Sequence, residues 1–205
     1  MKLMPFEKAK AEVEGLKDRL GRPIDPGISE ALVHFTRFAQ ALGFTTIQSC
    51  EGHIDWGEPF PWIDFTILHQ RVEVPAVWEV WKLHRRARAR REDEHHWQNE
   101  EQKTDQLCTM MTRYLLEHAK QQSLSLEATL SIDRWRRTVF RLQPTYKWLS
   151  EGYKKASAHQ ELDRLLDLQR QAMSSFASFC VASLEEEKNL VGIPDEGCHG
   201  CMGRG

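Results

Sequence analysis

Two regions in which apolar and polar residues alternate with a period of two most constrain the fold of this chain. In the first region, residues 62–68, the apolar residues Ile63, Phe65 and Ile67 are separated by polar ones. In the second, residues 124–133, every other residue is apolar. This alternation is typical of a strand with one buried face and one solvated face.

Each alternating region has a strand-like neighbour, so the sequence predicts two hairpins. Residues 44–48 precede the first region, and residues 138–143 follow the second. Apolar residues at three- and four-residue steps predict helices over residues 6–20, 28–42 and 158–187. The predicted fold is therefore α+β: an antiparallel sheet of about four strands with helices packed on one face.

Local signals place the limits of the second helix. Asp25 is a residue type that accepts from free backbone N–H groups at a helix start, and Pro26 suits the first helical position. Gly43 follows the last apolar residue of this helix, where a left-handed residue commonly ends the helix.

A charged stretch follows the first hairpin. Residues 84–103 carry few apolar side chains, and we expect an exposed charged helical arm there. Five arginines between Arg85 and Arg91 suggest phosphate or nucleic-acid binding, but the acidic residues that follow them favour a solvated arm.

The whole chain has 205 residues and a formal net charge of −2, which gives no general attraction to nucleic acid or to an anionic membrane. It carries no apolar run of signal-peptide or membrane-span type, so we expect a cytoplasmic protein that binds no membrane. We expect one α+β domain over residues 1–191 and a Gly- and Cys-rich tail over residues 192–205.

The turn predicted after residues 44–48 carries the string Ser49-Cys50-Glu51-Gly52-His53, here called the SCEGH turn. Cys50 and His53 are three residues apart, and Gly52 between them allows a tight turn. Two such ligands on one turn have the spacing of a zinc knuckle.

The tail repeats this form, with Cys198 and Cys201 three residues apart. Together with Cys50 and His53 they form a Cys₃His set that can satisfy a tetrahedral zinc ion. The sequence therefore predicts a metal-binding protein in which zinc ties the tail to the sheet. The alternative for the tail is a pair of free, reducible thiols.

Enzymatic alternatives use the same turn. Cys50 can act as a nucleophile with His53 as its base, oriented by Asp55 or Asp64. A hydrolytic metal site can be formed by His53, Asp55 and Glu58. In either case the SCEGH turn is the active site for a small molecule or a nucleotide, and nearby aromatic residues line its pocket. These aromatic residues are Trp56, Phe60 and Trp62.

Residues 30–68 resemble a segment of uncharacterised bacterial and phage proteins, in which a helix leads into a strand that ends in the same Ser-Cys-Glu-Gly-His string before a second strand. That resemblance implies no particular activity. The turn is also similar to the Thr-x-Ser-Ser-Cys-Ser-Gly-Arg string of the wybutosine-synthesis tRNA methyltransferases. Here Glu51 replaces a serine and His53 replaces the arginine, which puts the methyltransferase chemistry in doubt.

Overall fold

The computed structural model describes residues 3–17, 21–53, 60–67, 94–136, 139–145 and 159–191. The strands are β1 (Phe44–Cys50), β2 (Trp62–Ile67), β3 (Leu130–Arg136) and β4 (Val139–Pro144). The helices are α1 (Phe6–Gly15), α2 (Ser29–Leu42), α4 (Glu94–Gln122) and α6 (His159–Val191), with short 3-10 helices η1 (Pro26–Ile28) and η2 (Leu126–Ala128). The predicted α+β class is confirmed.

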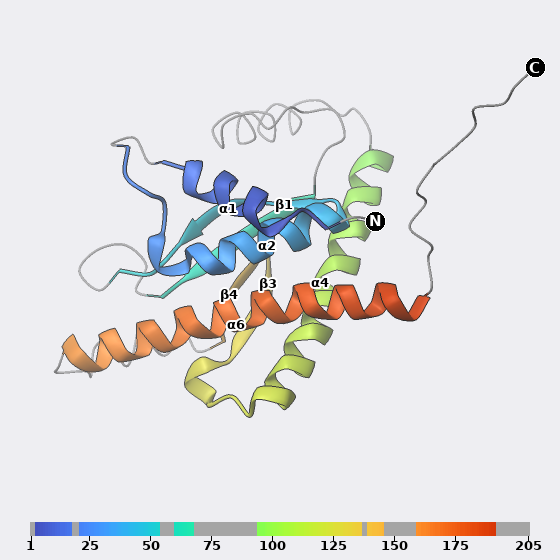
Figure 1. Cartoon of the computed structure of the whole chain (residues 1–205). Coiled ribbons are helices and arrows are strands. Elements are labelled where there is room, and N and C mark those ends of the chain that lie inside the picture. Colours follow the sequence, from blue (N-terminus) through green and yellow to red (C-terminus); the bar gives the residue numbers. More distant parts are fainter. Residues whose placement is uncertain are drawn as a thin grey trace, which may run out of the picture.

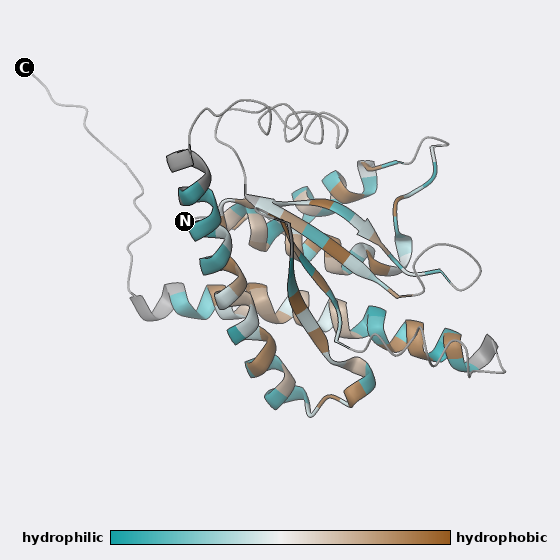
Figure 2. Cartoon of the chain, turned by 180° about the vertical axis from the view of Figure 1, so that it is seen from behind, coloured by the Kyte–Doolittle hydropathy of each residue, from teal (hydrophilic) through white to brown (hydrophobic). Residues whose placement is uncertain are grey.

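The four strands form one antiparallel sheet in the order β1-β2-β4-β3 (Figure 1). The two predicted hairpins, β1–β2 and β3–β4, are joined through the pairing of β2 with β4. Asp64 on β2 is opposite Arg141 on β4, and Arg141 is in turn opposite Asp133 on β3. Along the strands, hydrophilic and hydrophobic residues are mixed, as expected for a sheet with one polar face (Figure 2).

Helices α2, α4 and α6 contribute to one apolar core with the sheet. Phe65 stacks on Phe140 with ring centroids 5.1 Å apart, and Phe35 meets Phe65 edge-on. Helix α2 lies against both β1 and α6, while α1 packs on α2. Helices α2 and α6 run in the same direction (Figure 1). No helix in the described ranges is long and apolar enough to cross a membrane.

The predicted start of the second helix is partly wrong. Pro26 begins η1 rather than α2, and Asp25 adopts a left-handed backbone with φ 45° and makes no side-chain capping bond. Its carboxylate accepts a hydrogen bond from Ser49 instead. The predicted stop at Gly43 is confirmed, because Gly43 ends α2 with φ 79°.

The second alternating region forms less strand than predicted. Strand β3 begins at Leu130, whereas Leu126 and Ala128 lie in η2. Leu126 is 70% exposed, so its place in the alternation does not reflect burial. Part of the predicted arm, residues 94–103, lies in α4, and residues 84–93 lie outside the described residues. The tail, residues 192–205, also lies outside them.

Candidate functional site

The SCEGH turn begins within the last residues of β1 and docks onto η1. The Ser49 hydroxyl donates to the Asp25 carboxylate at 2.5 Å. The Glu51 carboxylate accepts from the Gly27 backbone N–H, also at 2.5 Å. The Glu51 carboxylate thus satisfies a backbone N–H at the start of η1. The turn is therefore attached to the helical layer through two of its side chains.

Arg170 on α6 holds the same turn through its backbone. Its Nε donates to the Glu51 carbonyl oxygen at 2.9 Å, and its Nη2 donates to the Gly52 carbonyl oxygen at 3.1 Å. Its Nη1 also lies 3.3 Å from the Asp167 carboxylate. The planar fork of the guanidinium suits this pattern, because it presents several donors in fixed directions.

Gly52 is required at its position for two reasons. Its φ of 80° is in the left-handed region, which other residues adopt at a cost. A Cβ atom there would lie 2.6 Å from the Leu166 side chain and 2.8 Å from the backbone carbon of Phe60. Gly52 is therefore needed both for its backbone conformation and because the Leu166 side chain and the Phe60 backbone come close to it.

The metal-binding function predicted for this turn is wrong for the part of the chain that the structure describes. In that part no group of three or more His, Cys, Asp and Glu side chains is placed to hold a metal ion. The Cys50 sulfur accepts a weak hydrogen bond from the Gly52 N–H at 3.4 Å, within the turn itself. A tetrahedral site needs four ligands that converge, and the spacing of Cys50 and His53 supplies only two.

Five of the predicted site residues are outside the described residues: Cys198 and Cys201 of the tail, and Asp55, Trp56 and Glu58 of the loop. Asp64, which was the other candidate to orient His53, is described, and its carboxylate accepts from Arg141. The predicted four-ligand set and its zinc ion therefore remain predictions. Arg85 and Arg91, on which the nucleic-acid hypothesis depends, are likewise outside.

Beside the docked turn lies a groove between the start of α2 and α6, here called the α2–α6 groove. Its volume is about 540 Å³. Gly27 and Arg170, which bind the SCEGH turn, also line the groove, so the turn fixes one end of it. The described residues that line it are Pro26, Gly27, Ser29, Glu30, Asp167, Arg170, Gln171, Ser174, Ser175 and Ser178.

Ser175 connects this groove to a buried histidine. The Ser175 Oγ lies 2.9 Å from His118 Nε2 on α4. His118 is only 1% exposed and packs against the rings of Phe176 and Phe179. Burial lowers the pKa of His118, so the imidazole is neutral at neutral pH. His118 Nδ1 has no hydrogen-bond partner within the described part of the chain.

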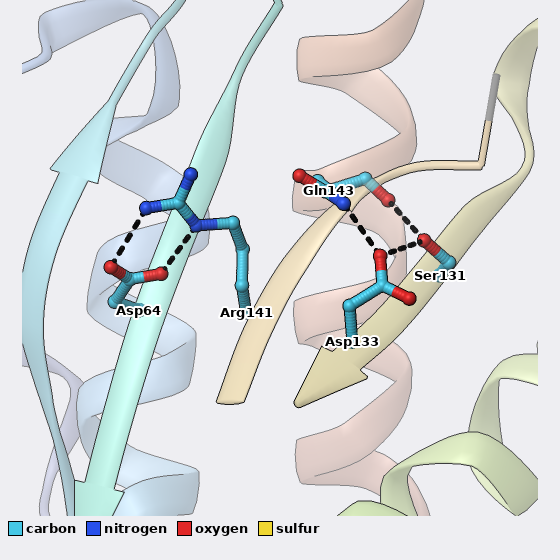
Figure 3. A network of polar contacts seen from close by, with 5 residues as sticks. All are labelled: Asp64, Ser131, Asp133, Arg141 and Gln143. Carbon is cyan, nitrogen blue, oxygen red and sulfur yellow. Dashed lines mark hydrogen bonds and ion pairs between the residues drawn. The ribbon is translucent and has the colours of Figure 1, made fainter. Parts of the chain in front are cut away.

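The polar face of the sheet carries a second group of interacting side chains (Figure 3). Arg141 donates to both carboxylate oxygens of Asp64, at 2.7 and 3.0 Å, and both residues are buried. The Arg141 guanidinium lies 3.9 Å from the centre of the Trp62 ring. On the neighbouring strands, Gln143 and Ser131 both donate to Asp133.

Sequence reasoning identified the SCEGH turn but missed its partners. The sequence predicts a helix cap at Asp25, and no local pattern points to Gly27 as a partner of the turn. No local signal marks Arg170, because it is one of several charged residues on a long amphipathic helix. Its role depends on the packing of α6 against the turn.

No family model, curated protein or solved structure matches this chain.

Proposed function

We propose that this protein binds a small polar molecule in the α2–α6 groove, with the SCEGH turn as the fixed end of the site. The observation that carries the proposal is that Gly27 and Arg170 both line the groove and hold the turn. A site whose wall is fixed by hydrogen bonds on both sides is preorganised, so ligand binding does not have to order it.

The lining residues favour a polar ligand. Four serine hydroxyls, from Ser29, Ser174, Ser175 and Ser178, supply donors and acceptors along the groove. Gln171 adds an amide, and of the lining residues that the structure describes Pro26 alone has an apolar side chain. A ligand in this groove would replace water at hydroxyl and carboxylate groups rather than bury apolar surface.

The test compares the natural protein with a variant in which the groove is filled. Ser178 is half-buried in the groove, and the Ser178→Trp substitution places an indole there. Thr112→Trp, at an exposed position of α4 outside the groove, is the matched control. A library of small polar metabolites is screened for compounds that raise the Tm of each protein.

We expect at least one compound to stabilise the natural protein and the Thr112→Trp control but not Ser178→Trp. Binding to the native state raises apparent stability by mass action, which is why Tm reports it. The proposal fails if no compound in the library separates the groove-filled variant from the other two proteins.

A further inference from the structure

The charged residues of the α2–α6 groove define which ligands it can take. Among the described residues, the lining has two carboxylates, Glu30 and Asp167, one guanidinium, Arg170, and no lysine. Asp25 and Glu51, which hold the docked turn, add two further acidic groups beside Gly27. The groove and its fixed end therefore carry a negative net charge.

Two features beside the groove could attract an anion, but both already bind other groups of this chain. The first is the N-terminal end of η1 and α2, where Glu51 accepts from the Gly27 N–H. The second is Arg170, whose donors are directed at two backbone carbonyl groups and at Asp167. An anionic ligand would have to displace these bonds, whereas a cation would meet carboxylates and hydroxyl oxygens.

The groove is elongated. Its lining on α6 extends from Asp167 to Ser178, which corresponds to about 16 Å at the standard helical rise. Gly27 lies beside Arg170, and Arg37 of α2 pairs with Glu185 further along α6. α2 and α6 run in the same direction (Figure 1). Glu30 follows Gly27 in the chain and Asp167 precedes Arg170, so Glu30 lies further along the groove than Asp167. The two carboxylates are thus offset along its length.

The histidine beside the groove adds no positive charge. Ser175 is bonded to His118, which is 1% exposed and packed between Phe176 and Phe179. The histidine stays neutral in this position because burial lowers its pKa. The Ser175 hydroxyl, at an exposed position of α6, therefore bonds to a neutral imidazole and not to a cation.

We propose that the α2–α6 groove takes an elongated organic cation with primary ammonium groups, which pair with Glu30 and Asp167 while the serine hydroxyls bind its polar atoms. This inference rests on the proposed small-molecule function and specifies its ligand class. Glu30 is the stronger ammonium site, because Asp167 shares its charge with Arg170.

The test uses three probes that have the same six-carbon chain but different charge: 1,6-diaminohexane, 1,6-hexanediol and adipate. Their dissociation constants are measured on the full chain at one fixed ionic strength. We expect the diamine to bind at least about tenfold more tightly than the diol, and adipate to bind least. Added salt should weaken the diamine only, since it screens charge pairs at the surface.

Variants locate the binding. Glu30→Gln should weaken the diamine more than Asp167→Asn does, and Ser178→Trp should remove its binding. Glu186→Gln is the control. It neutralises an exposed carboxylate of α6 outside the groove lining, so it should leave the dissociation constant of the diamine unchanged. Far-ultraviolet circular dichroism of each variant checks that it is folded.

The outcomes separate the two proposals. If the diol or adipate binds as tightly as the diamine, and Ser178→Trp removes that binding, the groove is a ligand site but the inferred charge preference is wrong. If the diamine does not bind, or if Glu186→Gln weakens it as much as Glu30→Gln, the inference is overturned. If neither these probes nor any metabolite distinguishes Ser178→Trp from the natural protein, the proposed function falls as well.

Discussion

Arg170 Nε donates to the backbone carbonyl oxygen of Glu51 at 2.9 Å, across a sequence separation of 119 residues. This contact joins α6 to the turn at the end of β1. It also brings together the two walls of the α2–α6 groove, because Glu51 is bonded in turn to Gly27.

Arg170→Lys should lower the free energy of unfolding by about 1–3 kcal/mol. A lysine ammonium is a point charge and cannot reproduce the paired geometry by which Nε and Nη2 reach the Glu51 and Gly52 carbonyl groups. Urea denaturation measures the difference. Arg164→Lys is the control: Arg164 is an exposed arginine of α6 that pairs with the exposed carboxylates of Glu127 and Glu161, so its replacement should cost less than about 1 kcal/mol. Equal costs for the two variants would contradict the role given to Arg170.

Gly52→Ala should lower stability by about 2–4 kcal/mol. The added Cβ would meet the Leu166 side chain at 2.6 Å and the Phe60 backbone at 2.8 Å, and the residue has a left-handed φ of 80°. Gly15→Ala is the matched control, because a Cβ at Gly15 meets nothing within 4 Å and Gly15 ends a helix. Thermal unfolding should show Gly15→Ala unchanged or slightly stabilised. A neutral Gly52→Ala would show that the turn does not pack as described.

Asp64→Leu should cost about 3–5 kcal/mol, because it leaves the buried Arg141 guanidinium without its carboxylate. The double variant Asp64→Leu, Arg141→Met should recover most of this loss, since it removes both charges. The exposed pair of Arg134 with Asp105 provides the comparison: Asp105→Leu should cost less than about 1 kcal/mol. Denaturant titrations measure the free energy of unfolding of the natural protein and the three variants. A double variant no more stable than Asp64→Leu would argue against a buried pair.

The stability of the protein should decrease as the pH falls below 6.5. Burial lowers the pKa of His118, and burial together with the nearby Arg37 lowers the pKa of His34, both from an ordinary value of 6.5. The unfolded chain then takes up protons that the folded chain does not, so this stability is complete above pH 6.5 and is lost as the pH falls towards the folded pKa values.

Denaturation at a series of pH values between 8 and 5 measures this slope. His118→Gln should reduce the slope, and the slope that remains belongs in part to His34. The assignment to His118 would be refuted by a variant whose pH dependence matches that of the natural protein.

The elements that could be predicted from the sequence are those in which local pattern and burial agree. The alternation in β2 matches the two faces of the strand in the structure: Ile63 and Phe65 lie in the core, while Asp64 pairs with Arg141. Gly43 ends α2 as predicted, since left-handed backbone at a helix end is a local requirement. The hairpins and the α+β class followed from these signals.

Alternation alone was misleading at Leu126, which continues the pattern of β3 but is exposed in η2. Alternating residue types indicate which face of a strand would be buried. They do not show whether a neighbouring strand is present to pair with that strand.

The hydrogen-bond partners of the SCEGH turn are set by the packing of segments far apart in the sequence. Its residues have the types and spacing of a metal knuckle, yet Ser49 bonds to Asp25, Glu51 bonds to Gly27, and Arg170 holds the backbone. Carboxylates and hydroxyls bind metals, helix ends and ligands with the same atoms, so residue type leaves the partner open. The partner is set by which groups the fold brings within hydrogen-bond distance, and here those groups come from η1 and from a helix more than a hundred residues away.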